Sequence, residues 1–148
     1  MYVKRKILSV FTLLLLTLST TGCTLHIENN FGNIEKRFTL KLYNDCKDDI
    51  YGYHVEYYLD EKPIGGTVGQ NADESEISGK YALQLAFYES YFPEGADLSK
   101  FQFEISVLDG EMRKSEFTET VELAAEYGKS YDIRVNGSFD EGFSAERG

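Results

Sequence analysis

Apolar and polar residues alternate along most of the chain from Arg37 onward, with the period of two that is typical of half-buried β-strands. In the first such run Phe38, Leu40 and Leu42 share one face and Tyr43 lies on the other. No stretch of ten or more residues after Arg37 has a helical period. The pattern predicts five clear strands, at residues 37–44, 51–59, 80–88, 101–109 and 130–137.

Two further segments predict weaker strands. Residues 64–70 contain three glycines and are expected to form a strand at a sheet edge, because glycine packs little and often marks bulges. In residues 111–123, Phe117, Val121 and Leu123 alternate inward, but Glu119 falls on the same face, so we expect a bulge or an edge there. Turn signals separate the runs, including residues 60–63, a single helical turn at 97–100 and the hairpin dipeptide Asp109–Gly110.

About seven short strands with turns between them predict an all-β fold, an antiparallel β-sandwich of one domain spanning residues 37–148. The segment from Leu123 to Val135 resembles the penultimate-strand region of fibronectin type III and other immunoglobulin-like domains. That resemblance implies that the hydroxyl of Tyr131 bonds to backbone upstream in a tyrosine corner. The chain has no tryptophan and lacks the cysteine pattern of antibody domains. A transthyretin-like sandwich remains the alternative to an immunoglobulin-like one.

The first residues have a different pattern. Lys4, Arg5 and Lys6 precede a twelve-residue apolar run, Ile7 to Leu18, and small residues follow. A helix of that length spans about 18 Å, whereas the hydrocarbon layer of a bilayer is about 30 Å thick. The layout is that of a secretory signal peptide and not of a transmembrane helix.

The residues Thr20, Thr21, Gly22 and Cys23 resemble the lipobox of bacterial lipoproteins, departing from its commonest form at Thr20. The resemblance implies cleavage after Gly22 and lipid attachment to Cys23. Residues 1–22 are then a signal peptide, and residues 23–36 are the lipid-attachment site and a short tether. The protein is expected to be lipid-anchored at the extracytoplasmic side of a cell membrane. The alternative is an ordinary signal peptide cleaved near Gly22, which leaves Cys23 as a free or disulfide-bonded thiol.

The net charge and the cysteines narrow the list of partners. The chain has a formal charge of −10, and the predicted signal segment removes three cations and no anions. Nucleic acid and anionic lipid headgroups are therefore poor partners. A cationic partner fits this charge, but solubility alone also accounts for it. With Cys23 assigned to the lipid, Cys46 has no second cysteine in the chain and is expected to be unpaired.

No motif for catalysis, metal binding or cofactor binding stands out. The chain has two histidines, His26 in the tether and His54, whose neighbour Glu56 projects from the same strand face. We interpret His54 as an exposed strand residue and not as half of a catalytic pair. The loop at residues 71–76 offers oxygen ligands but lacks the spacing of an EF-hand. We predict a non-enzymatic protein without metal or cofactor, and a small envelope hydrolase that uses paired carboxylates is the alternative.

Tyrosine is the unusual asset of the chain, which contains 11 of them. Tyr43, Tyr58 and Tyr88 fall on the outer faces of their predicted strands, and tyrosine suits interfaces because it combines apolar area with a hydroxyl. If the three share one sheet, they form a binding surface; otherwise they support cross-strand pairs. The sequence thus predicts a membrane-anchored binding or accessory domain whose partner is an envelope protein or another extracellular ligand. The oligomeric state is left open.

Overall fold

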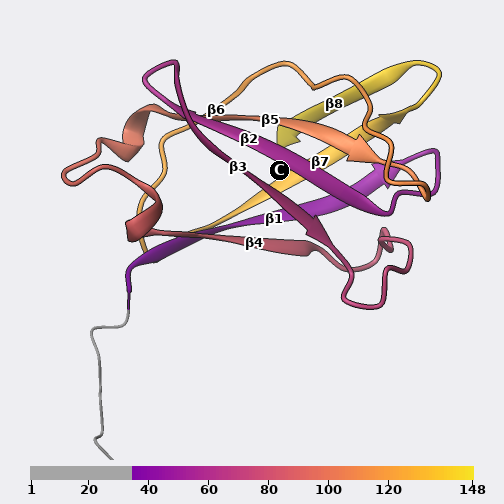
Figure 1. The fold of residues 1–148 in the computed structure, drawn as a ribbon, viewed down its shortest axis with the longest axis horizontal. Helices are drawn as coiled ribbons and strands as arrows, with labels where there is room; N and C mark the ends of the chain where they lie inside the picture. The colour runs from indigo at the N-terminus through magenta and orange to yellow at the C-terminus, as the bar shows by residue number, and fades with distance from the viewer. Residues whose placement is uncertain (1–34) are drawn as a thin grey trace, which may run out of the picture. The chain divides into compact units, whose positions relative to one another are not determined.

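The computed structural model describes residues 35–148, and these form an all-β sandwich of eight strands (Figure 1). Two short 3-10 turns, η1 (Glu89–Tyr91) and η2 (Leu98–Lys100), lie between the fourth and fifth strands. The strands are β1 (Arg37–Cys46), β2 (Gly52–Leu59), β3 (Lys62–Gln70), β4 (Leu83–Tyr88), β5 (Phe101–Leu108), β6 (Val121–Leu123), β7 (Ser130–Ser138) and β8 (Gly142–Arg147).

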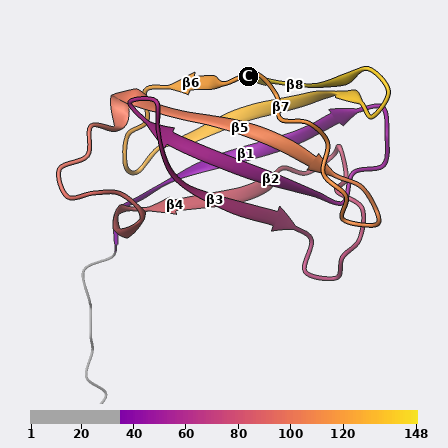
Figure 2. The same ribbon diagram turned by 45° about the horizontal axis from the view of Figure 1, so that its top comes forward.

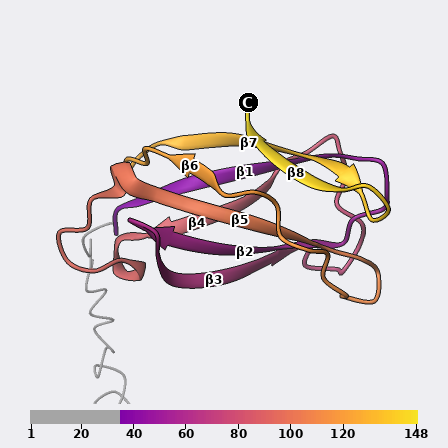
Figure 3. The same cartoon turned by 90° about the horizontal axis from the view of Figure 1, so that it is seen from above.

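The strands form two four-stranded sheets that pack face to face. One sheet has the order β4-β1-β7-β8 and the other the order β3-β2-β5-β6. Figures 2 and 3 show the long strands of both sheets running along the same axis of the molecule. Consecutive strands β1 and β2 belong to different sheets, as do β3 and β4, so the chain crosses between the layers several times.

The core lies between the sheets and is built from the inward half of each alternating strand. Phe38, Leu40 and Leu42 on β1 are fully buried, as the alternation predicts. At the end of the sandwich where β1 begins, the core is aromatic. The ring centroid of Phe38 lies 5.1 Å from that of Phe87 and 5.0 Å from that of Phe101, and Tyr57 meets Phe87 edge-on at 5.1 Å. Such pairs add about 0.5–1.5 kcal/mol beyond the area they bury.

The pairing of β1 with β7 is parallel, whereas every other strand pair is antiparallel. The predicted purely antiparallel sandwich is wrong in this respect. The register runs from Thr39 opposite Ser130 to Cys46 opposite Gly137. Parallel neighbours need a crossover connection, and here the whole second sheet lies between the two strands in sequence.

Tyr131, at the start of β7, makes the backbone contacts that the tyrosine-corner resemblance implies. Its hydroxyl accepts a hydrogen bond from the N–H of Glu126 at 2.9 Å and donates one to the carbonyl of Ala124 at 3.3 Å. The turn before it reverses direction at Gly128, whose φ of +83° favours glycine. The N–H of Gly128 also bonds to the carbonyl of Arg37, which ties this turn to the start of β1.

The structure has eight strands and not the seven that the sequence predicts. The additional strand, β8, is a low-propensity edge segment that pairs with β7 through a hairpin. The predicted strand at residues 111–123 contracts to β6, three residues long. Upstream of β6, Thr118 is buried and its Oγ1 accepts from the N–H of Ile105. Phe117, predicted to point inward, is instead 38% exposed.

Three further local predictions are confirmed, whereas the strand predicted at residues 80–88 begins only at Leu83. β3 is the edge strand of its sheet, and Asp60–Glu61 form the turn that leads into it. Residues 98–100 form the single helical turn η2, where the Asp97 carboxylate accepts from the N–H of Ser99. No helix within residues 35–148 has the length and apolar character needed to cross a membrane.

Candidate functional site

The outer face of the β3-β2-β5-β6 sheet carries polar side chains that face one another across strands. On β2 the alternation that buries Tyr53, Val55 and Tyr57 turns Glu56 and Tyr58 outward. The antiparallel register places Glu56 opposite Glu104 and Tyr58 opposite Gln102 on β5. It also places Gln102 opposite Glu122 on β6. These residues therefore form two adjoining rows on one surface.

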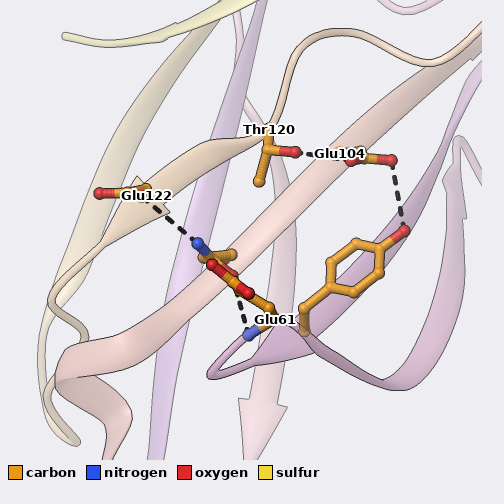
Figure 4. A pocket seen from close by; sticks show the side chains of 6 residues that line it. Glu61, Glu104, Thr120 and Glu122 are labelled. Carbon is orange, nitrogen blue, oxygen red and sulfur yellow. Dashed lines mark hydrogen bonds between the residues drawn. The ribbon is translucent and has the colours of Figure 1, made fainter.

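A hollow of about 330 Å³ opens on this surface, and Figure 4 shows it from close by. We call it the acidic hollow, because three of the side chains around it are glutamates. They come from the β2–β3 turn, from β5 and from the end of the sheet at β6. The lining residues are Tyr58, Glu61, Gln102, Glu104, Thr120 and Glu122.

Glu104 lies at the centre of a hydrogen-bond network in the acidic hollow. The hydroxyl of Thr120 donates to its Oε1 at 2.6 Å, and the hydroxyl of Tyr58 lies 3.2 Å from its Oε2 (Figure 4). The same Tyr58 hydroxyl lies 3.4 Å from Oε2 of Glu56. A phenol has one proton, so it serves one carboxylate at a time. Burial, followed by the charge of Glu104, raises the pKa of Tyr58.

Gln102 connects the other side of the acidic hollow. Its Nε2 donates to Glu122 at 3.4 Å, and its Oε1 accepts from the backbone N–H of Glu61 at 3.2 Å. Asp60 and Glu61 have φ values of 52° and 64°, so both central residues of this hairpin turn are left-handed. That conformation is typical of a type I′ turn, which usually contains glycine. The Gln102 bond thus holds a strained turn against β5.

The carboxylates of this face have no ion-pair partner among residues 35–148. Glu56 and Glu104 are directly opposite on adjacent strands, an arrangement that destabilises a sheet when both are charged. None of the ion pairs in residues 35–148 involves Glu56, Glu104 or Glu122. Lys100, near the turn, is already paired with Asp60 at 2.9 Å. Chemically, the face can accept hydrogen bonds from cationic or hydroxyl groups of a ligand.

His54 lies one row beyond Glu56 on the same face, at the other end of β2. Its Nδ1 is 3.1 Å from the Nζ of Lys114, and its ring centroid is 5.5 Å from that of Phe117. Burial, with the Lys114 charge second, lowers the pKa of His54 against the opposite effect of Glu56. The histidine contacts a cation and an aromatic ring, and its hydrogen-bond partner is Lys114 and not Glu56. His54 is thus a strand residue, but it is partly buried and not exposed as predicted.

The three tyrosines predicted as a binding surface do not lie together. Tyr58 lines the acidic hollow, whereas Tyr43 and Tyr88 belong to the other sheet. Each of these two lies beside an arginine. The guanidinium of Arg134 is 5.5 Å from the ring centroid of Tyr43, and that of Arg37 is 5.8 Å from that of Tyr88. They are cross-strand pairs at opposite ends of β1, so the single tyrosine surface is not formed. The predicted sites Gly22 and Cys23 lie outside the described residues.

The other candidate groups are engaged locally. The Cys46 thiol donates to the carbonyl of Val135 at 3.3 Å, and burial raises its pKa to about 11. In the 71–76 loop, the Asn71 amide bonds to the carbonyls of Ser75 and Glu76, and Asp73 accepts from Ser75. Within residues 35–148 no group of three or more histidine, cysteine, aspartate or glutamate side chains is arranged to hold a metal ion.

No family model and no curated protein matches the chain. Among solved structures, pneumolysin matches with 10% identity and a TM-score of 0.36, over 77% of this chain and 24% of its own. A disulfide-locked mutant of intermedilysin with human CD59 matches with 12% identity and a TM-score of 0.32, over 77% and 24%. The chain spans about a quarter of the length of these two proteins.

Sequence reasoning found one of the six lining residues, Tyr58. Gln102, Glu104 and Glu122 could be placed on outer faces by alternation, because each sits between inward apolar residues. What alternation does not contain is the order of strands in a sheet. That β2, β5 and β6 meet on one surface is known only from the strand order and register of the structure.

Proposed function

We propose that this protein is a membrane-anchored bacterial lipoprotein whose β-sandwich is a non-enzymatic binding module at the cell envelope. The lipobox resemblance of residues 20–23 supports the anchor, with Cys23 as the lipid-attachment site. The observation that carries the binding role is the acidic hollow on the outer face of the β3-β2-β5-β6 sheet. It gathers carboxylate, amide and hydroxyl groups without a cation, and these groups are suited to hold a complementary ligand.

The strand order supports the transthyretin-like alternative for the sandwich over the immunoglobulin-like one. Immunoglobulin constant domains have their first two strands side by side in one sheet. Here β1 lies between β4 and β7, and β2 lies in the other sheet. The contacts of the tyrosine corner at Tyr131 are thus a local feature that occurs here in a sandwich with a different strand order.

The groups in the hollow support binding over catalysis. Glu104 is held by Thr120 and Tyr58, and Glu122 by Gln102, so both carboxylates are fixed as hydrogen-bond acceptors. A nucleophilic mechanism needs a base beside a serine or cysteine. His54 lies outside the residues that line the hollow, and Cys46 is bonded to the backbone of β7.

The anchor is tested by metabolic labelling with palmitate and by intact mass in a bacterium. The native chain is expected to carry an acyl adduct and to sediment with membranes, and Cys23→Ser is expected to lose both. Cys46→Ser is the matched control and should keep the adduct. A native protein of unmodified mass in the medium would overturn the anchoring half.

The binding role is tested by site-specific photocrosslinking on whole cells. A photoreactive residue at Gln102 reports on the acidic hollow, and one at Asp132 reports on the outer face of the other sheet. We expect a discrete adduct from position 102 and none from position 132. Equal labelling from both positions, or none from either, would contradict a binding face on this sheet.

A small hydrolase is the second candidate, because Glu104 and Glu122 line one hollow. Paired carboxylates about 5–10 Å apart are the arrangement of most glycosidases. Turnover of a panel of aryl glycosides, abolished by Glu104→Gln and by Glu122→Gln, would favour this candidate. Absence of turnover together with a position-102 adduct would favour the binding module.

A further inference from the structure

β3 is the open edge of the sheet that carries the acidic hollow. It is nine residues long and pairs on one side with β2 from Gly52–Gln70 to Leu59–Lys62. On its other side, its backbone N–H and C=O groups have no hydrogen-bond partner among residues 35–148. In Figure 1 β3 lies at the front of the sandwich, and no strand covers the side of β3 that faces away from β2. Such a row of free groups is a template for another extended segment.

Only one end of this edge has features that discourage pairing with another strand. Lys62, Pro63 and a register shift opposite Tyr57–Tyr58 protect the start of β3. Residues 64–70 contain no charge and no proline, and Val68 is 50% exposed. Among the other edges, β6 has three residues, β8 ends in Glu146 and Arg147, and β4 is shorter, with six residues. β3 is therefore the longest weakly guarded edge.

The three glycines of β3 differ in how much room a side chain would have. A Cβ at Gly65 would lie 2.5 Å from the Tyr57 hydroxyl, and one at Gly69 would lie 2.6 Å from Leu83, so a side chain at either position would displace a neighbouring side chain. At Gly66, on the outer face, a Cβ would meet nothing closer than 3.4 Å. Packing therefore tolerates a side chain at Gly66. The space above Gly66 is therefore bordered by the side chains of Glu56 and His54 and by the open edge.

Charge selects the kind of segment that fits. Gly66, Glu56 and Glu104 lie in one row across β3, β2 and β5. A strand added to β3 would run about 4.8 Å from it, and its outward side chains would point over Gly66 toward the two carboxylates. A second copy of this chain in that place would bring two such acidic faces side by side. The face instead complements a lysine or arginine.

We propose that β3 accepts an extended, basic peptide segment of a partner protein as a fifth strand of the β3-β2-β5-β6 sheet. Main-chain hydrogen bonds to residues 64–70 hold the segment, and a cationic side chain crosses Gly66 to reach Glu56, while Glu104 adds to the negative charge of the same row. This is β-strand addition with one charged specificity contact. The proposal rests on the proposed binding role of this face and not on the lipid anchor.

The test uses residues 23–148 with Cys23→Ser and a nine-residue synthetic peptide that alternates lysine and valine. Binding is followed by calorimetry, and amide hydrogen exchange identifies the strand that becomes protected. We expect protection of amides in residues 64–70, and binding that weakens as salt is added. A peptide with glutamate in place of lysine, and one N-methylated on alternate amides, should both bind at least about fivefold more weakly.

Two variants test the charged contact. The double variant Glu56→Gln, Glu104→Gln is expected to weaken binding about fivefold, as the loss of exposed charge pairs does. Gly66→Lys places a cation of the protein itself over Glu56 and should have a similar effect. The control, Asp132→Asn with Glu146→Gln, removes the same charge from the other sheet and should bind the peptide unchanged.

Four outcomes would overturn the proposal. The first is equal binding of the N-methylated peptide, which means charge attraction without strand addition. The second is protection at β4 or β8. The third is concentration-dependent protection of β3 without peptide, which identifies a second copy as the occupant. The fourth is no binding up to about 1 mM peptide. If the adduct from position 102 is still seen in that last case, the proposed binding face is retained and only the basic peptide as its partner is rejected.

Discussion

The hydroxyl oxygen of Tyr131 lies 2.9 Å from the backbone nitrogen of Glu126 and accepts its hydrogen bond, which fastens the turn before β7 to the strand itself. Tyr131→Phe removes this bond and the bond to Ala124 while keeping the ring in the core. We expect a loss of about 1–2 kcal/mol of the free energy of unfolding, measured by urea denaturation. An unchanged unfolding midpoint would show that water replaces the hydroxyl at no cost.

Tyr53→Phe, unlike Tyr131→Phe, should not lower the free energy of unfolding. Tyr53 is fully buried, and its hydroxyl has no protein hydrogen-bond partner among the described residues. Burial is also the main cause that raises the pKa of this phenol. Removing the hydroxyl is expected to leave the free energy of unfolding unchanged or to increase it by about 1 kcal/mol. Destabilisation in the same urea assay would reveal a bonded hydroxyl and contradict the expectation.

Glu61→Gly should stabilise the β2–β3 hairpin. The φ of +64° at Glu61 is a conformation that glycine adopts without strain, and the Gln102 bond uses the backbone N–H, which glycine retains. We expect a gain of about 0.5–1 kcal/mol in the free energy of unfolding. The matched control is Lys62→Gly in the extended strand β3, which should lose about the same amount.

His54 should titrate below its ordinary pKa of 6.5, because burial and Lys114 both disfavour the imidazolium. Its contribution to stability is therefore present above pH 6.5 and is lost as the pH falls through the lower native pKa. Lys114→Met is expected to raise the pKa of His54, and Glu56→Gln to lower it. NMR titration of the imidazole protons, with His26→Asn for assignment, checks both directions. A pKa that moves with neither variant would contradict the contact.

Cys46 should react slowly with thiol reagents in the folded state. Burial, assisted by Asp48 and Asp45, raises its pKa from 9.0 to about 11, so less thiolate is present at pH 8. We expect Ellman's reagent to react at least about tenfold more slowly with the native Cys23→Ser variant than with the same protein in urea. The stabilising effect of the neutral thiol is complete below pH 9 and is lost as the pH rises toward 11. Equal rates in the two states would refute this.

The strands that could be predicted are those whose pattern reflects burial on one face. Alternation located β1, β2, β4, β5 and β7 because each contributes a row of large apolar residues to the core. Alternation does not locate β8 because its residues, Gly142 to Arg147, are mostly small or polar and mostly exposed. Phe117 was placed inward by its spacing, but the segment around it bonds to β5 through Ser115 and Thr118 and turns the ring outward.

The candidate site depends on information that a single sequence does not contain. Alternation puts Tyr43, Tyr58 and Tyr88 on outer faces, and all three are only partly buried. Whether they meet is decided by the sheet to which each strand belongs. Tyr43 and Tyr88 are separated from Tyr58 because β1 and β4 belong to one sheet and β2 to the other. The acidic hollow arises from contacts between β2, β5 and β6, which lie far apart in the chain.

The central position of β1 has a mechanical consequence. A force applied to the chain ahead of Arg37 pulls β1 lengthwise, while its ladders to β4 on one side and β7 on the other run across the strand. These hydrogen bonds are then loaded together in shear and do not open one after another from an end. Pulled from Gly148, the edge strand β8 has a single ladder to lose. Under the proposed N-terminal anchor, a pulling force would thus load the strand that is best placed to resist it.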